Sequence, residues 1–193
     1  FHAAYHTQMG VYTHDMGIRE GGKLCINAGA GPMGLGALTY ALHCDRRPGL
    51  VVVADINQER LARAEHLFPP EEIRRDEGIE LHFVNTGTVD DPVAALREIT
   101  GGAGFDDVLC YAPVAAVVTQ SSLILGRDGC LNFFAGPTDK NFQAPINFYE
   151  VHYGSQHVIG TTGGNTQDEM ESLELTAAGR LDPAVMVTHI GGL

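Results

Sequence analysis

The sequence predicts an α/β protein built on a doubly wound, six-stranded parallel sheet. Three observations support this fold class. Short apolar runs alternate with helix-like segments and short connections along most of the chain. Runs such as residues 50–55 are apolar at consecutive positions, as in parallel strands buried on both faces. A glycine-rich turn, residues 29–34, joins the first strand-like run to the first helix-like segment.

Strands are expected at residues 24–28, 50–55, 80–84, 107–111, 129–135 and 156–161. Helices are expected at residues 32–44, 57–68, 71–77, 91–100, 113–126 and 166–178. Asn57 and Asp91 are suited to capping two of them, and Thr166 to Glu169 reads as a capping box. We also expect a helix broken near Gly10 within residues 1–18, a long loop at 136–154 and a last strand at 185–190.

Composition narrows the possible partners. The chain has 193 residues, of which 44% are hydrophobic, enough for a full core. A formal net charge of -12 argues against nucleic acid or an anionic membrane surface as partner. No apolar run approaches the length of a membrane span. The four cysteines are widely spaced, as expected of free thiols in a reducing compartment, so we expect a cytoplasmic protein.

Residues 29–34, Gly-Ala-Gly-Pro-Met-Gly, form the pattern Gly-x-Gly-x-x-Gly. In a strand–turn–helix unit the first glycine allows a tight turn and the second lets a pyrophosphate approach the backbone. The third lets helix and strand pack closely. Phosphates would then meet unpaired N–H groups at the positive end of the helix. The pattern predicts a dinucleotide site, with Gly29, Gly31, Pro32, Met33 and Gly34 as cofactor-binding residues.

Asp55 ends the second strand, 21 residues after Gly34. A carboxylate there can accept hydrogen bonds from an adenosine ribose, and it repels a 2′-phosphate. Because Ile56 and Asn57 supply no adjacent base, we expect NAD to be preferred to NADP, with Asn57 also near the cofactor. The alternative is that Asp55 only caps the turn into the next helix.

Ligands of such sheets bind beyond the carboxyl ends of the strands, which adds further candidates. The small residues Ala112, Ala135 and Gly160 lie at the ends of the fourth, fifth and sixth strands, where a nicotinamide ring would need room. Ordinary tight turns would explain the same residues.

The chain offers no catalytic group or metal site of its own. His2 and His6 could share a helical face but lack a third ligand, and His152 and His157 form no better set. The acidic residues fall on expected solvent faces or helix starts, so no acid–base pair is nominated. We therefore expect any hydride chemistry to come from the cofactor.

With these residues in view, the sequence resembles the coenzyme domain of zinc-type medium-chain alcohol and polyol dehydrogenases. The glycine turn, Asp55 and the closing residues 179–189 carry this resemblance. Residues 14–18 and 147–153 are similar to the L-sorbose 1-phosphate reductase branch of that family.

The resemblance implies hydride transfer between NAD(P)H and a sugar phosphate or polyol, with zinc polarising the reacting oxygen. It implies a fragment of a two-domain dehydrogenase, whose zinc-holding catalytic domain lies outside this chain. Residues 1–22 would be a lead-in helix and linker from that domain, 23–183 the dinucleotide-binding domain, and 184–193 the start of the return segment. The fragment alone would be inactive. The resemblance also implies a homo-oligomer formed through the sixth-strand edge, residues 156–161.

Three rival interpretations remain. An FAD-binding domain would carry its glycine motif at the very start of the protein and a Glu in place of Asp55. A methyltransferase that uses S-adenosylmethionine would need an acidic residue in the first strand, where residues 24–28 have none. A non-catalytic dinucleotide sensor or oligomerisation module fits the same residues.

Overall fold

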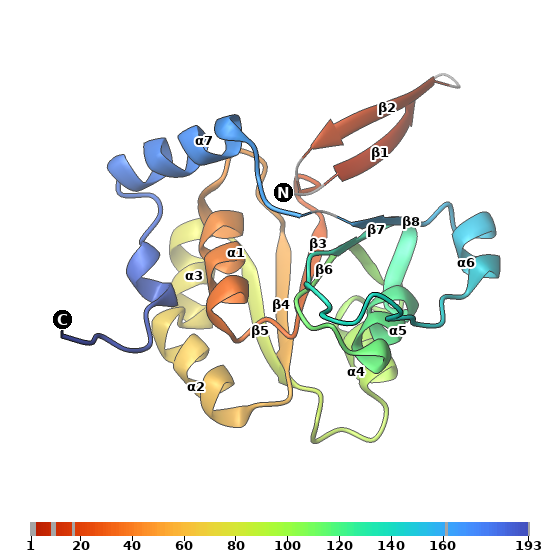
Figure 1. The fold of residues 1–193 in the computed structure, drawn as a ribbon, viewed down its shortest axis with the longest axis horizontal. Coiled ribbons are helices and arrows are strands. Elements are labelled where there is room, and N and C mark those ends of the chain that lie inside the picture. The colour runs from red at the N-terminus through yellow and green to blue at the C-terminus, as the bar shows by residue number, and fades with distance from the viewer. Residues whose placement is uncertain (1–2, 9–10, 17, 161, 193) are drawn as a thin grey trace.

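A computed structural model describes residues 3–8, 11–16, 18–160 and 162–192 (Figure 1). Six parallel strands form one sheet in the order β5-β4-β3-β6-β7-β8. Their bounds are β3 (Lys23–Asn27), β4 (Leu50–Asp55), β5 (Glu80–Asn85), β6 (Phe105–Cys110), β7 (Leu125–Phe133) and β8 (His157–Gly160). The order reverses direction at β3, which lies beside both β4 and β6. The predicted doubly wound parallel sheet is confirmed.

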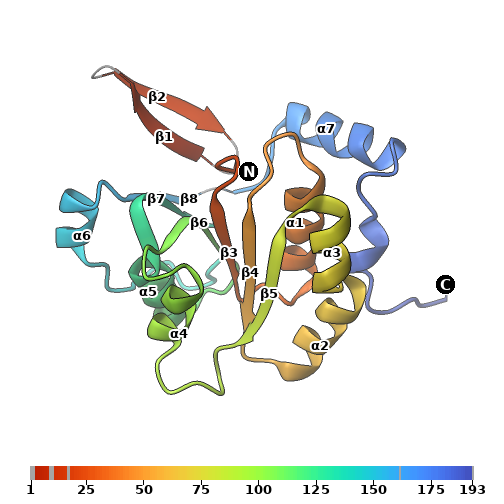
Figure 2. The same ribbon diagram turned by 180° about the vertical axis from the view of Figure 1, so that it is seen from behind.

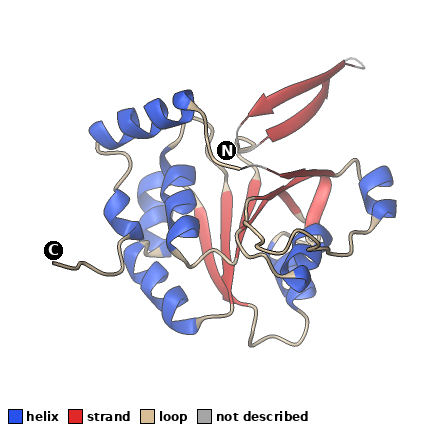
Figure 3. Cartoon of the chain, in the orientation of Figure 1, coloured by secondary structure: helices blue, strands red, loops and turns tan. Residues whose placement is uncertain are grey.

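Helices cover both faces of the sheet (Figures 1 and 2). On one face lie α1 (Pro32–His43), α2 (Gln58–Leu67) and α3 (Pro70–Glu77), and on the other α4 (Pro92–Ile99) and α5 (Ala115–Leu123). The short α6 (Phe148–Tyr153) precedes β8, whereas α7 (Thr166–Ala177) and the 3₁₀ turn η1 (Pro183–Met186) lie on the α1 side (Figure 3). This alternation of helices and strands is what the apolar runs predicted.

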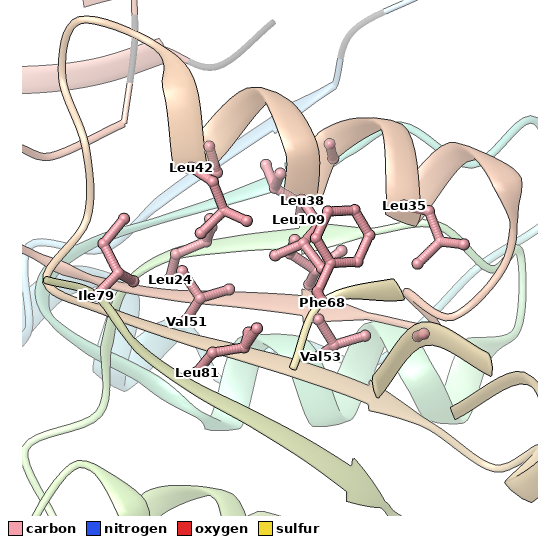
Figure 4. Close-up of a cluster of buried hydrophobic side chains, with 14 of the residues drawn as sticks. Leu24, Leu35, Leu38, Leu42, Val51, Val53, Phe68, Ile79, Leu81 and Leu109 are labelled. Atoms are coloured by element: carbon pink, nitrogen blue, oxygen red, sulfur yellow. The ribbon is translucent and has the colours of Figure 1, made fainter. Parts of the chain in front are cut away.

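Two apolar clusters hold these layers together. Under α1, its residues Leu35, Leu38 and Leu42 meet Val51 and Val53 of β4, all of them fully buried (Figure 4). Under α4 and α5, a second cluster gathers around Phe105, Leu96 and Val108. Because β3, β4 and β6 are buried on both faces, each contains a run of consecutive apolar residues, at 24–26, 51–54 and 108–110.

The described residues before position 17 contradict the expected helix. Residues 3–8 and 11–16 form an antiparallel hairpin of β1 (Ala3–Gln8) and β2 (Val11–Met16), separate from the main sheet. The register pairs Ala3 with Met16 at one end of the two strands and Gln8 with Val11 at the other. Gly10, where the helix was expected to break, lies outside the described residues.

Three other boundaries are corrected. Helix α5 ends at Leu123 and Leu125 already begins β7, because the N–H of Phe105 bonds the carbonyl of Ile124 and draws the chain into the sheet. The expected loop 136–154 contains α6, which Asn147 caps by accepting from the N–H of Tyr149. The cap of α7 is Asn165, one residue earlier than predicted, in a capping box with Asp168.

The expected last strand is also wrong. Residues 185 and 186 lie in η1, and residues 187–190 have no regular structure. Asp182 accepts from the N–H of Ala184 and starts the 3₁₀ turn, while Val185 packs against the cluster under α1. This apolar segment therefore covers a helix instead of extending the sheet.

Within the described ranges no helix is long and apolar enough to cross a bilayer.

Candidate functional site

A cavity of about 580 Å³ opens at the carboxyl ends of β3, β4 and β6, where the strand order reverses. Its walls are the glycine turn with the start of α1, the β4–α2 turn, and the start of α5. The lining residues with a role below are Asn27, Ala28, Gly31, Pro32, Met33, Gly34, Asp55, Ile56, Arg60, Tyr111, Ala112, Val114, Val117 and Gln120. In open α/β sheets this crevice is where ligands bind.

None of the three motif glycines has a positive φ, so the space around each of them, and not its backbone conformation, explains the need for glycine. A Cβ on Gly34 would lie 2.0 Å from the carbonyl oxygen of Gly29, and a Cβ on Gly29 would lie 2.5 Å from the carbonyl oxygen of Ile26. Gly31 differs, since a Cβ there would find only Nη1 of Arg60, at 4.0 Å. Two glycines thus allow turn and helix to pack, and Gly31 leaves open space for a ligand.

Asp55 organises the turns on both sides of the crevice. It is 8% exposed. Its Oδ1 accepts from the N–H groups of Ile56 and Asn57 at 2.8 and 3.0 Å, and its Oδ2 accepts from the N–H of Ala30 at 3.1 Å. A carboxylate oxygen can accept two hydrogen bonds, so Oδ2 keeps capacity for a ligand hydroxyl. Asp55 therefore caps a turn, as the alternative held, and also faces the cavity.

Two helices begin at this cavity without a side-chain cap. The N-cap residues are Gly31 for α1 and Val114 for α5, and neither side chain accepts a hydrogen bond from its helix. By contrast Asn57, Asp91 and Asn165 cap α2, α4 and α7. The first turn of α1 also contains no acidic residue. Its N–H groups and positive dipole end are left for an anion.

Two further residues line the cavity: Arg60, to which no sequence observation pointed, and Tyr111, at the predicted end of the fourth strand. Arg60 is exposed one turn into α2, and the fold brings it beside Gly31, although no base adjoins Asp55 in sequence. Tyr111, directly after β6, packs edge-on against Phe134 with ring centroids 5.8 Å apart. Burial raises the pKa of Tyr111 above its ordinary value, so its hydroxyl stays protonated.

The other predicted site residues divide into three groups. Pro32, Met33, Gly34 and Ala112 line the cavity together with Gly31 and Asp55. Gly29 lies beneath Gly34, and Asn57 accepts from the N–H of Arg60 to cap α2, so these two shape the walls from outside the lining. Ala135 and Gly160 do not line the cavity.

The described residues do not fit a zinc ion. No group of three or more histidine, cysteine or acidic side chains is placed to hold a metal among them. The cysteines Cys25, Cys44, Cys110 and Cys130 are buried thiols that form no disulfide, as predicted. Burial raises the pKa of the Cys130 thiol to about 12, which opposes the thiolate that zinc requires.

The family profile described as zinc-binding dehydrogenase matches residues 32–178, from the start of α1 to the end of α7. The chain belongs to the zinc-binding dehydrogenases. This confirms the resemblance noted from the glycine turn, Asp55 and the closing segment.

Named relatives of this zinc-binding dehydrogenase chain include two sugar-phosphate enzymes. It is 54% identical to mannitol-1-phosphate 5-dehydrogenase of Aliivibrio fischeri and 45% identical to L-sorbose 1-phosphate reductase of Klebsiella pneumoniae. Both matches cover 100% of this chain and 45% of the relative, so the chain spans about half the length of these proteins. A solved structure, an alcohol dehydrogenase zinc-binding domain protein from Burkholderia ambifaria, is 26% identical with a TM-score of 0.69. That match covers 84% of this chain and 40% of the other.

Proposed function

We propose that this chain is the nicotinamide-dinucleotide-binding domain of an oxidoreductase that transfers a hydride between NAD(H) and a sugar phosphate or polyol. The observation that carries the proposal is the open space at Gly31, between two uncapped helix N-termini and beside Asp55. A side chain at Gly31 would fill the place where a pyrophosphate approaches the backbone.

The lining residues suit the parts of a dinucleotide. The N–H groups at the start of α1 would bind the pyrophosphate, and the guanidinium of Arg60 beside Gly31 would add positive charge there. Oδ2 of Asp55 would accept from an adenosine ribose hydroxyl. Ala112 leaves room at the end of β6, as a nicotinamide ring requires. When bound, the nicotinamide supplies the hydride chemistry.

The buried position of Asp55 supports NAD over NADP. Its carboxylate is held in place by three backbone N–H groups, so it cannot turn away from a 2′-phosphate. Arg60 is the cation that could offset this repulsion, but it lies on the Gly31 side of the cavity.

Titration of NADH and NADPH, followed by nicotinamide fluorescence, tests this preference. We expect NADH to bind at least about tenfold more tightly, since one unpaired close charge repulsion is worth about 1.4 kcal/mol or more at such a site. Asp55→Ser should reduce the difference in affinity between NADH and NADPH. Arg60→Met should lower the affinity for both ligands by the same factor. Tighter binding of NADPH to the unmodified chain would contradict the role given to Asp55. Saturable binding of FAD alone would replace the nicotinamide proposal.

The substrate class rests on the relatives. Mannitol-1-phosphate 5-dehydrogenase and L-sorbose 1-phosphate reductase are both named for sugar phosphates, and these residues are closely similar to theirs. Zinc would be held by residues outside those described here, so we propose that this chain binds cofactor and that turnover requires the catalytic domain. Its buried free thiols support a cytoplasmic location. A panel of sugar phosphates and free polyols, offered with NAD(H) to the full-length protein, tests the substrate class.

A further inference from the structure

Asn27 is a buried polar residue at the base of the cavity. It is the last residue of β3, is 2% exposed and directly precedes the glycine turn. Parallel strands buried on both faces are mostly apolar, and the preceding residues Leu24, Cys25 and Ile26 follow that rule. A carboxamide in this position costs free energy unless its hydrogen bonds are made, so its partners indicate what it does.

The carboxamide of Asn27 joins the two walls of the cavity. Nδ2 donates to Oγ of Ser121 on α5 at 2.8 Å, while Oδ1 accepts from the N–H of Ala28 at 3.2 Å. Nε2 of Gln120, also on α5, lies 3.4 Å from the same Oδ1. One side chain thus bonds both to the start of the glycine turn and to the helix opposite.

The orientation of this amide is fixed by its neighbours. The hydroxyl of Ser121 donates its single proton to the carbonyl of Val117 at 2.8 Å, so its oxygen is left to accept. Nδ2 of Asn27 must therefore face Ser121, and Oδ1 must face the turn. Exchange of the two atoms would place donor against donor at Ala28.

The turn needs such support at Ala28. This residue has φ +56, in the left-handed region that L-residues with a Cβ seldom adopt. Its conformation determines where the chain enters Gly29 and hence where the N–H groups at the start of α1 point. Asn27 holds the N–H of Ala28 on one side, and the N–H of Gly29 donates to the carbonyl of Ala54 on the other.

We infer that Asn27, through Ser121, is a positioning residue that sets the affinity of the cavity for the pyrophosphate part of its ligand. The inference rests on the proposed dinucleotide function. Asn27 acts by fixing the turn around Ala28 relative to α5, and it need not touch the ligand. A residue needed only for folding would instead affect stability and all ligands alike.

Binding of NADH, ADP and adenosine to Asn27→Val and Ser121→Ala, measured by fluorescence and calorimetry, tests this inference. We expect the affinity for NADH and for ADP to fall about tenfold in Asn27→Val and about threefold in Ser121→Ala. These changes correspond to the loss of one or two buried hydrogen bonds. Adenosine binding should change less than about twofold, because it lacks the phosphates that meet the turn. Asn132→Val is the matched control, since Asn132 is a strand asparagine 1% exposed that does not line the cavity.

The outcomes separate the two proposals. If the unmodified chain fails to bind NADH, the proposed function fails, and the inference with it. If it binds NADH and both variants bind NADH as tightly, only the inference is overturned. An equal loss of adenosine and NADH affinity also overturns it, since that is the result of a general structural role. Should Asn27→Val fail to fold, the NADH, ADP and adenosine affinities of Ser121→Ala alone test the inference, because Ser121 does not line the cavity.

Discussion

Gly31 and Gly34 stand three residues apart in one motif, yet their surroundings differ completely. A methyl group on Gly34 would overlap the backbone of Gly29, whereas a methyl group on Gly31 would enter open space. We predict that Gly34→Ala lowers the free energy of unfolding by about 3 kcal/mol or more. The new methyl group would overlap the backbone of Gly29, which cannot move aside as a flexible side chain can. Gly31→Ala should leave stability within about 0.5 kcal/mol.

The same pair should behave in the opposite way in ligand binding. Gly31→Ala fills the space reserved for the ligand, so NADH affinity should fall at least about tenfold while the fold persists. Urea unfolding and NADH titration on both variants check the two halves of this prediction. A Gly31→Ala variant that binds NADH normally would mean that the ligand does not approach this turn.

The surroundings of a single residue could be predicted where a local sequence pattern determines them. Gly34 and Asp55 follow from the strand–turn–helix pattern, because the turn fixes both their spacing and their neighbours. Arg60 and Asn27 did not follow, since their roles arise from contacts across the cavity, with Gly31 and with α5. An arginine on an exposed helix and an asparagine in an apolar strand show nothing unusual until those walls are placed together.

Elements were predictable where local signals and burial agree. Strand β4 was placed at its observed bounds because its residues are apolar throughout and end at Asp55. The end of α5 was misplaced, since residues 124 and 125 continue the apolar pattern while the backbone bond from Phe105 decides where the strand begins. Helix α6 has only six residues, too few for periodicity to reveal, although its cap Asn147 was a usable signal.

The C-terminal segment, which packs on α1 through Val185, is also bonded to α2 by one arginine. Nη2 of Arg63 on α2 donates to the carbonyls of Val185 and Val187, at 3.1 and 3.0 Å. We predict that Arg63→Met, which keeps the apolar stem, lowers the free energy of unfolding by about 1 kcal/mol and speeds amide exchange at residues 183–188. Hydrogen exchange read by mass spectrometry checks this. Arg74→Met, on the exposed surface of α3, is the control, and equal exchange in both variants would contradict the prediction.

At the scale of the whole molecule, the sheet has one edge with an apolar surface beside it. β8 ends the strand order and, within the part of the chain described, pairs only with β7. Val158 on this strand is 44% exposed, and Phe148 on the neighbouring α6 is 74% exposed. Unpaired strand edges invite pairing with a second chain, and a twofold axis would place two copies of β8 side by side as antiparallel neighbours.

We therefore predict that the chain is a dimer through β8 and that Val158→Lys makes it a monomer. A lysine in the centre of the short edge strand would place two like charges close together across the twofold axis, which opposes pairing. Sedimentation velocity over a range of concentrations measures the effect. Leu173→Lys is the control, because Leu173 on α7 is 70% exposed and lies on a different element. Dimers that survive Val158→Lys would show that β8 is not the interface. Dimers that Leu173→Lys disrupts instead would place the interface on the surface around α7.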